Sequence, residues 1–383
     1  MESLIKPTLK LASMNKILLI LFLSNSLLSQ SIERIDSGSI GNAAFKILFP
    51  AAWKKKLVMF AHGYEFMGSS PRQSANKNWL TSMSVFLERG FAVAASDYSI
   101  QGFSMPTGVD DTEALRRYFL NKYGKPDTAI IVGQSLGGGV AIATIENFGD
   151  GYDGALGLCS FASRPYLQCR KEFDIYATFN VLFPGLVPSL SNVMDVQVPY
   201  KAISPGEIGS KAQQIRNGYM KDSVLANAFA KRFDLKLGDL AMSLMFNENV
   251  LRDLAQKSGG NPFDNTNTIY SGFPNDLEIN QKVERLAATA DPNTIFGKYD
   301  RTGNIDKPIL LMHTIYDQLI PPSYGAVNFE NMVHNQGKDK YLTVKYTNGQ
   351  GHCAFSPIQI GFAFDELRQW LKTGTKALPG YVK

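Results

Sequence analysis

The sequence predicts an α/β fold in which a mostly parallel sheet is flanked by helices and interrupted by a mainly helical insertion. Short apolar segments alternate with segments of helical spacing as far as residue 160. The alternation is absent between residues 161 and 306, and it returns after residue 307. Hydrophobic residues make up 44% of the 383 residues and charged residues 19%, which is typical of a folded globular protein.

Five segments in the first part of the chain have the composition of strands. Short apolar runs of this kind are expected where both faces of a parallel sheet are covered. The segments are AAFKILF (43–49), KLVMFA (56–61), FAVAASDYS (91–99), TAIIVG (128–133) and YDGALGLCS (152–160). Segments with helical spacing lie between them at 79–90, 108–124 and 136–149. We therefore expect a parallel sheet with helices on both faces.

The segment from residue 161 to residue 306 is far longer than an ordinary loop, so it predicts a separate subdomain. Its aromatic residues Phe173, Tyr176, Phe179 and Phe183 recur at nearly helical spacing. We expect them to form the core of this subdomain. As a group they could also cover an apolar binding pocket.

The strand pattern returns near the C-terminus in PILLMHT (308–314) and YLTVKYT (341–347), and a helical segment follows at 357–374. The predicted domains are a core formed by residues 32–160 and 307–383 and a subdomain of residues 161–306.

The N-terminal residues have the pattern of a cleavable signal peptide. MNKILLILFLSNSLL (14–28) contains one lysine and then seven uninterrupted apolar residues, too few to span a bilayer as a helix. Small residues at Ser29 and Ser31 predict cleavage after Ser31, and Met14 could be the true start. We expect a secreted or periplasmic protein with no stable membrane span. The alternative is an N-terminal helix packed on the domain.

Charge and cysteine content limit the possible partners. The formal net charge is only +5 and no long run of Lys and Arg occurs, which argues against nucleic acid. There is no CxxC or HxxxH pattern, so we expect no metal site, and no cofactor is expected. Cys159, Cys169 and Cys353 could form one disulfide in an oxidising compartment, most simply between Cys159 and Cys169. Three buried free thiols are the alternative.

Ser135 lies in GQSLG (133–137), between a predicted strand and a predicted helix. This is the context of a nucleophile elbow, a tight turn that raises the serine hydroxyl above the edge of the sheet. Glycines two residues on either side allow the strand and helix to approach closely. The alternative is a Gly/Ser loop without chemistry.

A serine hydroxyl needs a base and a group that orients the base. His352, in the Gly-rich loop between the last predicted strand and the last predicted helix, is the predicted base. Asp317 directly follows the preceding strand and is the predicted acid, since a triad in such sites runs Ser, acid, His along the chain. His313 is expected to be a buried core residue and His334 a solvated helix residue.

The negative oxygen of a tetrahedral intermediate needs backbone N–H donors. Leu136 follows the proposed nucleophile, and Tyr64 lies in the loop after the strand that ends in FAHG, so these two residues form the predicted oxyanion hole. His62 and Gly63 are expected to shape that loop. Tyr64 and Glu65 are predicted to contact the substrate, and the alternative is that HGYEFMGSS is only a turn.

The motifs FAHGY, GQSLGGG, YDQLIP and GHC, in this order, resemble those of the α/β-hydrolase superfamily. The resemblance covers roughly residues 40–160 and 305–380. It implies Ser135, Asp317 and His352 as a catalytic triad, and it implies that the subdomain of 161–306 is a cap or lid over the site.

These inferences predict a secreted serine hydrolase that cleaves small-molecule carboxylic esters through an acyl-enzyme, with no nucleic-acid partner. The apolar insertion suggests a substrate with a hydrophobic or aromatic group. The alternatives are a serine peptidase of the same fold and a non-catalytic binding protein. The oligomeric state is left open.

Overall fold

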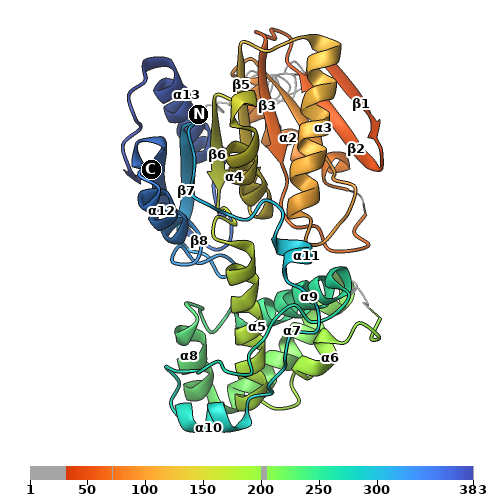
Figure 1. The fold of residues 1–383 in the computed structure, drawn as a ribbon, viewed down its shortest axis with the longest axis vertical. Coiled ribbons are helices and arrows are strands. Elements are labelled where there is room, and N and C mark those ends of the chain that lie inside the picture. The colour runs from red at the N-terminus through yellow and green to blue at the C-terminus, as the bar shows by residue number, and fades with distance from the viewer. Residues whose placement is uncertain (1–31, 71, 200–204, 383) are drawn as a thin grey trace, which may run out of the picture.

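The structure, a computed structural model, describes residues 32–70, 72–199 and 205–382 (Figure 1). The predicted signal peptide of residues 1–31 lies outside the described residues. Within them, one sheet has nine strands. They are β1 (Arg34–Ile40), β2 (Ala43–Phe49), β3 (Lys56–Ala61), β4 (Phe91–Ser96), β5 (Thr128–Gln134), β6 (Gly154–Leu158), β7 (Ile309–Tyr316), β8 (Leu342–Gln350) and β9 (Gly380–Tyr381).

The strand order is β1-β2-β4-β3-β5-β6-β7-β8-β9. Strand β2 pairs antiparallel with β1 and β4, and the pairs from β4 to β9 are parallel. The predicted fold class is confirmed, because this order of a mostly parallel sheet is that of an α/β-hydrolase. The chain crosses from one side of β3 to the other between β4 and β5. Loops that follow β3 and β5 therefore meet at a switch point, where ligands bind in open α/β sheets.

Helices cover both faces of the sheet. Alternate side chains of β3 enter two separate hydrophobic clusters, with Met59 in one and Val58 in the other, and both are fully buried. Helices α3 (Met105–Tyr123), α4 (Leu136–Phe148) and α12 (Ala326–Asn335) pack on the first face, and α2 (Lys77–Leu87) and α13 (Pro357–Thr373) pack on the second.

The described residues between β6 and β7 form helices and connecting loops, without a strand of the sheet. The helices are α5 (Pro165–Leu182), α6 (Leu190–Met194), α7 (Pro205–Tyr219), α8 (Ser223–Arg232), α9 (Leu240–Ser258), α10 (Asp276–Lys282) and α11 (Asn293–Phe296). We call this segment the cap. Helices α5 to α10 gather beyond the end of the sheet toward which β6 points (Figure 1). Among the described residues, no helix is both long and apolar enough to cross a membrane.

The cap and the sheet share hydrophobic contacts. One cluster joins buried cap residues, including Phe173, Tyr176 and Phe179, to Leu136 and Val140 of α4. The aromatic side chains at helical spacing on α5 therefore form the core of the cap, and they anchor it over the start of α4.

Close packing between α4 and β3 depends on a glycine. A Cβ atom on Gly137 would overlap the backbone carbonyl oxygens of Ala61 and His62. Backbone atoms cannot move aside as the end of a flexible side chain can, so helix α4 can lie this close to β3 only with glycine at this position.

We predict that Gly137→Ala lowers the free energy of unfolding by about 3 kcal/mol or more, because the new methyl group meets backbone. The matched control is Gly209→Ala in α7, an exposed position where an added Cβ contacts nothing. The control should raise stability by about 0.5 to 1 kcal/mol through helix propensity. Denaturant unfolding of the three proteins measures both changes, and equal stability of Gly137→Ala and the unmodified protein would contradict the prediction.

Candidate active site

Ser135 stands at a sharp turn between β5 and α4. Its φ of 58° is in a region that residues with a side chain rarely adopt. The turn is held by backbone bonds, since the N–H of Ser135 donates to the Leu158 carbonyl at 2.9 Å and the Ser135 carbonyl accepts from Phe161 N–H at 2.9 Å. The structure therefore places the predicted nucleophile on the strained strand-turn-helix that the GQSLG pattern indicates.

The three residues predicted as a triad lie in one chain of hydrogen bonds. His352 Nε2 is 2.7 Å from Ser135 Oγ, and His352 Nδ1 is 2.8 Å from Asp317 Oδ2. A carboxylate can only accept, so the proton of a neutral imidazole belongs on Nδ1. Nε2 is then free to accept the proton of the serine hydroxyl.

The acid and the base come from neighbouring loops at the same edge of the sheet. Asp317 follows β7 and His352 follows β8, and these two strands are parallel neighbours. Gln318 Oε1 accepts from His352 N–H at 2.9 Å, and Gly351 N–H donates to the Tyr316 carbonyl at 2.9 Å. The histidine loop is thus tied directly to the loop that carries the acid.

Asp317 is held in its charged form. Its side chain is fully buried, and burial alone would raise its pKa. Hydrogen bonds from His352 and from the backbone N–H of Ile320 outweigh the burial and keep the pKa of Asp317 below its usual value. A permanent negative charge here stabilises the imidazolium that forms when His352 takes a proton.

The other three histidines have partners of their own. His62 is buried, stacks on Tyr98 and hydrogen bonds through Nδ1 to the Gly63 carbonyl at 2.7 Å. His313 is buried with Nε2 at 2.8 Å from the Ile320 carbonyl, and burial lowers the pKa of both His62 and His313. His334 is exposed on α12 and pairs with Asp339. Among the described residues, the histidine that hydrogen bonds to the Ser135 hydroxyl is His352 and none of these three.

The predicted oxyanion loop lies against the serine. A Cβ atom on Gly63 would be 3.2 Å from Ser135 Cβ, which is tighter than most contacts of this kind, so glycine lets the loop approach the serine without crowding it. Leu136 is the first residue of α4, where backbone N–H groups have no partner within the helix. Tyr64, the second predicted donor, follows Gly63 directly and its side chain lines the cavity above Ser135.

The predicted substrate contact of Glu65 does not agree with its position. Its carboxylate bonds to Arg72 at 2.8 Å and accepts from Gln73 N–H at 2.7 Å, and Glu65 does not line the cavity. Its charge is used to fix the loop after β3. The reason is Arg72, seven residues further along, which pairs with this carboxylate within the loop itself.

A cavity of about 830 Å³ opens over Ser135 and His352. This volume is suitable for a small organic molecule. Its lining combines residues of the sheet loops with residues of α9 in the cap. The main apolar contributors are Tyr64, Phe66, Met67, Met242, Met245 and Phe246.

Three aromatic rings of this lining form a cluster. The ring centroids of Tyr64 and Phe66 are 5.5 Å apart, those of Tyr64 and Phe246 5.6 Å, and those of Phe66 and Phe246 6.0 Å. Most cap residues of the lining lie on α9, and Ile208 of α7 joins them, whereas the aromatic residues at helical spacing on α5 are in the cap core. The sequence pattern of α9 did not distinguish its cavity face from its buried face.

Asp253 of α9 connects the cap to the oxyanion loop, and sequence analysis did not identify it. Its carboxylate is fully buried, accepts from the Tyr64 hydroxyl at 3.3 Å and from Phe103 N–H at 2.5 Å, and pairs with Lys257 at 2.8 Å. The spacing of Asp253 and Lys257 on one helix is typical of an ion pair, but the residues it meets in the sheet loops lie far away in sequence.

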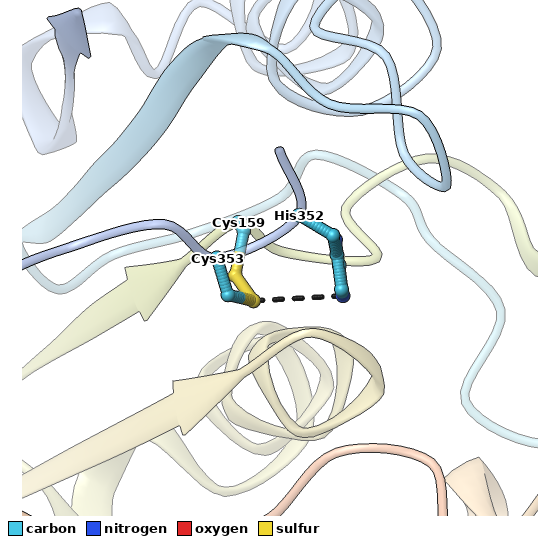
Figure 2. A group of neighbouring side chains, drawn as sticks. All are labelled: Cys159, His352 and Cys353. Carbon is cyan, nitrogen blue, oxygen red and sulfur yellow. Dashed lines mark hydrogen bonds between the residues drawn. A yellow bond between two sulfur atoms is a disulfide. The ribbon is translucent and has the colours of Figure 1, made fainter. Parts of the chain in front are cut away.

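The cysteine pairing differs from the expectation. Cys159 is bonded to Cys353 (Figure 2). Cys169 is a buried free thiol. The expected Cys159–Cys169 pairing is wrong because α5 carries Cys169 into the hydrophobic core of the cap, whereas the loop after β8 returns Cys353 to the end of β6.

The disulfide also lies beside the candidate base. Figure 2 shows the Cys353 sulfur facing His352, with Sγ 3.5 Å from Nε2. The ligand atoms of Cys159, His352 and Cys353 lie within 4.8 Å of one another, which is close enough for a metal ion. In the disulfide, however, neither sulfur is a thiolate, and a thiolate is the form of cysteine that binds metals.

The chain has the α/β-hydrolase fold, as its strand order and the turn at Ser135 show. Several solved structures are similar to it, with low TM-scores and low sequence identity. An esterase of Pyrococcus furiosus has a TM-score of 0.47 and 14% identity over 90% of this chain and 94% of its own. An acylaminoacyl peptidase of Pyrococcus horikoshii has a TM-score of 0.48 and 12% identity, and the match covers 93% of this chain and 44% of the peptidase. Brefeldin A esterase, a bacterial homologue of human hormone-sensitive lipase, has a TM-score of 0.44 and 12% identity, and the match covers 96% of this chain and 87% of the esterase.

No protein-family model and no curated protein sequence matches the chain.

We predict that Asp253→Asn lowers the free energy of unfolding by about 2 to 4 kcal/mol, because Lys257, in a mostly buried position, loses its only opposite charge and keeps only the neutral carbonyls of Gln101 and Phe103 among the described residues. The control is Asp110→Asn, which breaks a much more exposed pair with Lys298 and should change stability far less. Thermal and denaturant unfolding provide the measurement. Equal losses of unfolding free energy in the two variants would show that the Asp253–Lys257 pair contributes no more than an exposed ion pair does.

Proposed function

We propose that this protein is a secreted serine hydrolase that cleaves carboxylic esters through an acyl-enzyme. The observation that carries the proposal is the chain of hydrogen bonds from Ser135 through His352 to Asp317 at the floor of a cavity. A serine at a strained turn, a histidine within 2.7 Å and a buried carboxylate behind it are the groups that nucleophilic acyl transfer requires.

The reaction begins when Ser135 Oγ attacks the ester carbonyl carbon while His352 Nε2 takes the hydroxyl proton. Asp317 stabilises the imidazolium and keeps the ring in its orientation. When the tetrahedral intermediate collapses, the histidine gives the proton to the departing alcohol, and an ester of Ser135 remains. A water molecule activated by His352 then attacks this acyl-enzyme and releases the acid and free Ser135.

The oxyanion of each tetrahedral intermediate is assigned to the backbone N–H groups of Leu136 and Tyr64. The start of α4 also places the positive end of a helix dipole at this point. Gly63 supports the assignment, since its close approach to Ser135 brings the Tyr64 loop to the side of the nucleophile.

The shape of the cavity favours an ester with a hydrophobic or aromatic group. The cluster of Tyr64, Phe66 and Phe246 offers ring faces and edges to a planar or apolar moiety. Two methionines of α9 complete this wall with flexible side chains that adapt to irregular groups.

Export of the protein is part of the proposal. A disulfide between Cys159 and Cys353 persists most readily in an oxidising compartment, which supports the signal peptide predicted from the sequence.

A fluorophosphonate probe should label the native protein at Ser135, because this class of reagent phosphonylates an activated serine. Ser135→Ala should abolish the labelling. Ser243→Ala is the matched control, since Ser243 lines the same cavity without a hydrogen-bond partner among the described residues, and it should still label. The native protein remaining unlabelled, or labelling of Ser135→Ala, would rule out Ser135 as the nucleophile.

Phe246→Ala should lower kcat/KM for esters of aromatic or long-chain acids by about 10- to 100-fold, because truncation removes apolar contact. Acetyl esters, which do not reach the cluster, should change by less than about threefold. Phe362→Ala on the exposed side of α13 is the control and should change neither value. Equal losses for both ester classes would contradict the proposed substrate class, and faster turnover of peptide amides than of esters would favour a peptidase.

A further inference from the structure

The disulfide opens onto the same cavity as the candidate nucleophile. Cys353 is among the lining residues together with Ser135 and His352, whereas Cys159 at the end of β6 is fully buried. A small molecule that reaches Ser135 is therefore also next to Cys353, whereas the buried Cys159 does not line the cavity.

The Cys353 sulfur and the Ser135 hydroxyl face the same nitrogen. His352 Nε2 is 2.7 Å from Ser135 Oγ and 3.5 Å from Cys353 Sγ, as the dashed line in Figure 2 marks for the sulfur. In the disulfide, Cys353 carries no proton and cannot exchange one with the imidazole. As a thiol it could, because sulfur at this distance is within hydrogen-bonding range of the ring.

We infer that Cys353 is a masked second nucleophile of this cavity, which a small dithiol releases by reducing the disulfide and which then competes with Ser135 for His352. This role would make Cys353 a site of modification by soft electrophiles. It rests on the proposed function of His352, although its chemistry does not require ester turnover.

The release is a thiol–disulfide exchange. A dithiol thiolate attacks the Cys353 sulfur, the bond to Cys159 breaks, and Cys159 leaves as a thiolate that takes up a proton. The second thiol of the reagent then attacks the reagent's first sulfur, which is bonded to Cys353 in the mixed disulfide, and Cys353 leaves as a thiolate. Two electrons pass from the dithiol to the protein, which gains two thiols, and the reagent becomes a cyclic disulfide.

The released thiol changes the proton balance of the site. A neighbouring imidazole favours the thiolate and so lowers the pKa of a cysteine, with the proton moving to the ring. Once Nε2 carries that proton, it cannot take the proton of Ser135. Reduction should therefore suppress ester hydrolysis and at the same time expose a reactive thiolate.

Cys169 is an internal control for reactivity. It is a free thiol in every state of the disulfide, but it is buried in the core of the cap, and burial raises its pKa well above the usual value. A buried neutral thiol reacts slowly with alkylating agents.

The test compares the full-length oxidised protein with the same protein treated with dithiothreitol, desalted without oxygen and exposed to iodoacetamide at pH 7. Peptide mass spectrometry should find Cys353 alkylated at least about tenfold faster than Cys169 in the reduced protein, and unmodified in the oxidised protein. Ester hydrolysis should fall by about tenfold or more on reduction and return on reoxidation. Unchanged hydrolysis after reduction, or equal labelling of Cys169 and Cys353 as in an unfolded chain, would overturn the inference.

Two variants separate the thiol from the loss of the covalent link. Cys159→Ser leaves the Cys353 thiol free, whereas Cys159→Ser/Cys353→Ser lacks both the link and the thiol. The single variant should hydrolyse esters about tenfold more slowly than the double variant, and alkylation of its Cys353 should slow when His352→Ala is added. Equal hydrolysis rates of the two variants would mean that loss of the disulfide alone slows hydrolysis, and this would overturn the proposed role of the Cys353 thiol. An oxidised protein that labels with fluorophosphonate while reduction has no effect would refute this inference and leave the proposed function standing.

Discussion

The close contact between α4 and β3 determines the geometry of the site. Gly137 lets the helix meet the backbone of Ala61 and His62, and the turn that connects β5 to this closely packed helix holds Ser135 at a positive φ. The loops after β3, β7 and β8 end at the same edge because their strands run parallel. Tyr64, Asp317 and His352 therefore lie on loops that begin near the serine, and local bonds such as those of Gln318 to His352 and of Glu65 to Arg72 hold these loops in place.

The strands of the sheet, and the positions of Asp317 and His352 at the same sheet edge as Ser135, could be predicted from local patterns. Buried strands are short apolar runs, and the carboxyl ends of parallel strands share one edge, so a polar residue directly after a strand is placed by its position alone. Asp317 and His352 each follow such a strand. His313, inside a strand, could be assigned to the core by the same reasoning, and the structure buries it with a backbone partner.

The contacts between distant segments could not be predicted. Cys159 and Cys353 are separated by 194 residues, and nothing local shows that the loop after β8 returns to the end of β6. Asp253 meets the Tyr64 loop only because α9 docks on the sheet, and the apolar pattern of a helix does not reveal which neighbour its faces meet. Glu65 was predicted as a substrate contact, but Arg72 occupies its carboxylate.

The proposed function depends above all on a covalent acyl intermediate at Ser135. The most direct measurement is rapid acid quenching of the protein during turnover of a nitrophenyl ester, followed by intact and peptide mass spectrometry. We expect an added acyl group on Ser135 that accumulates within the first turnover and is absent from Ser135→Ala. Turnover without any acylated protein, or acylation of a residue other than Ser135, would contradict it.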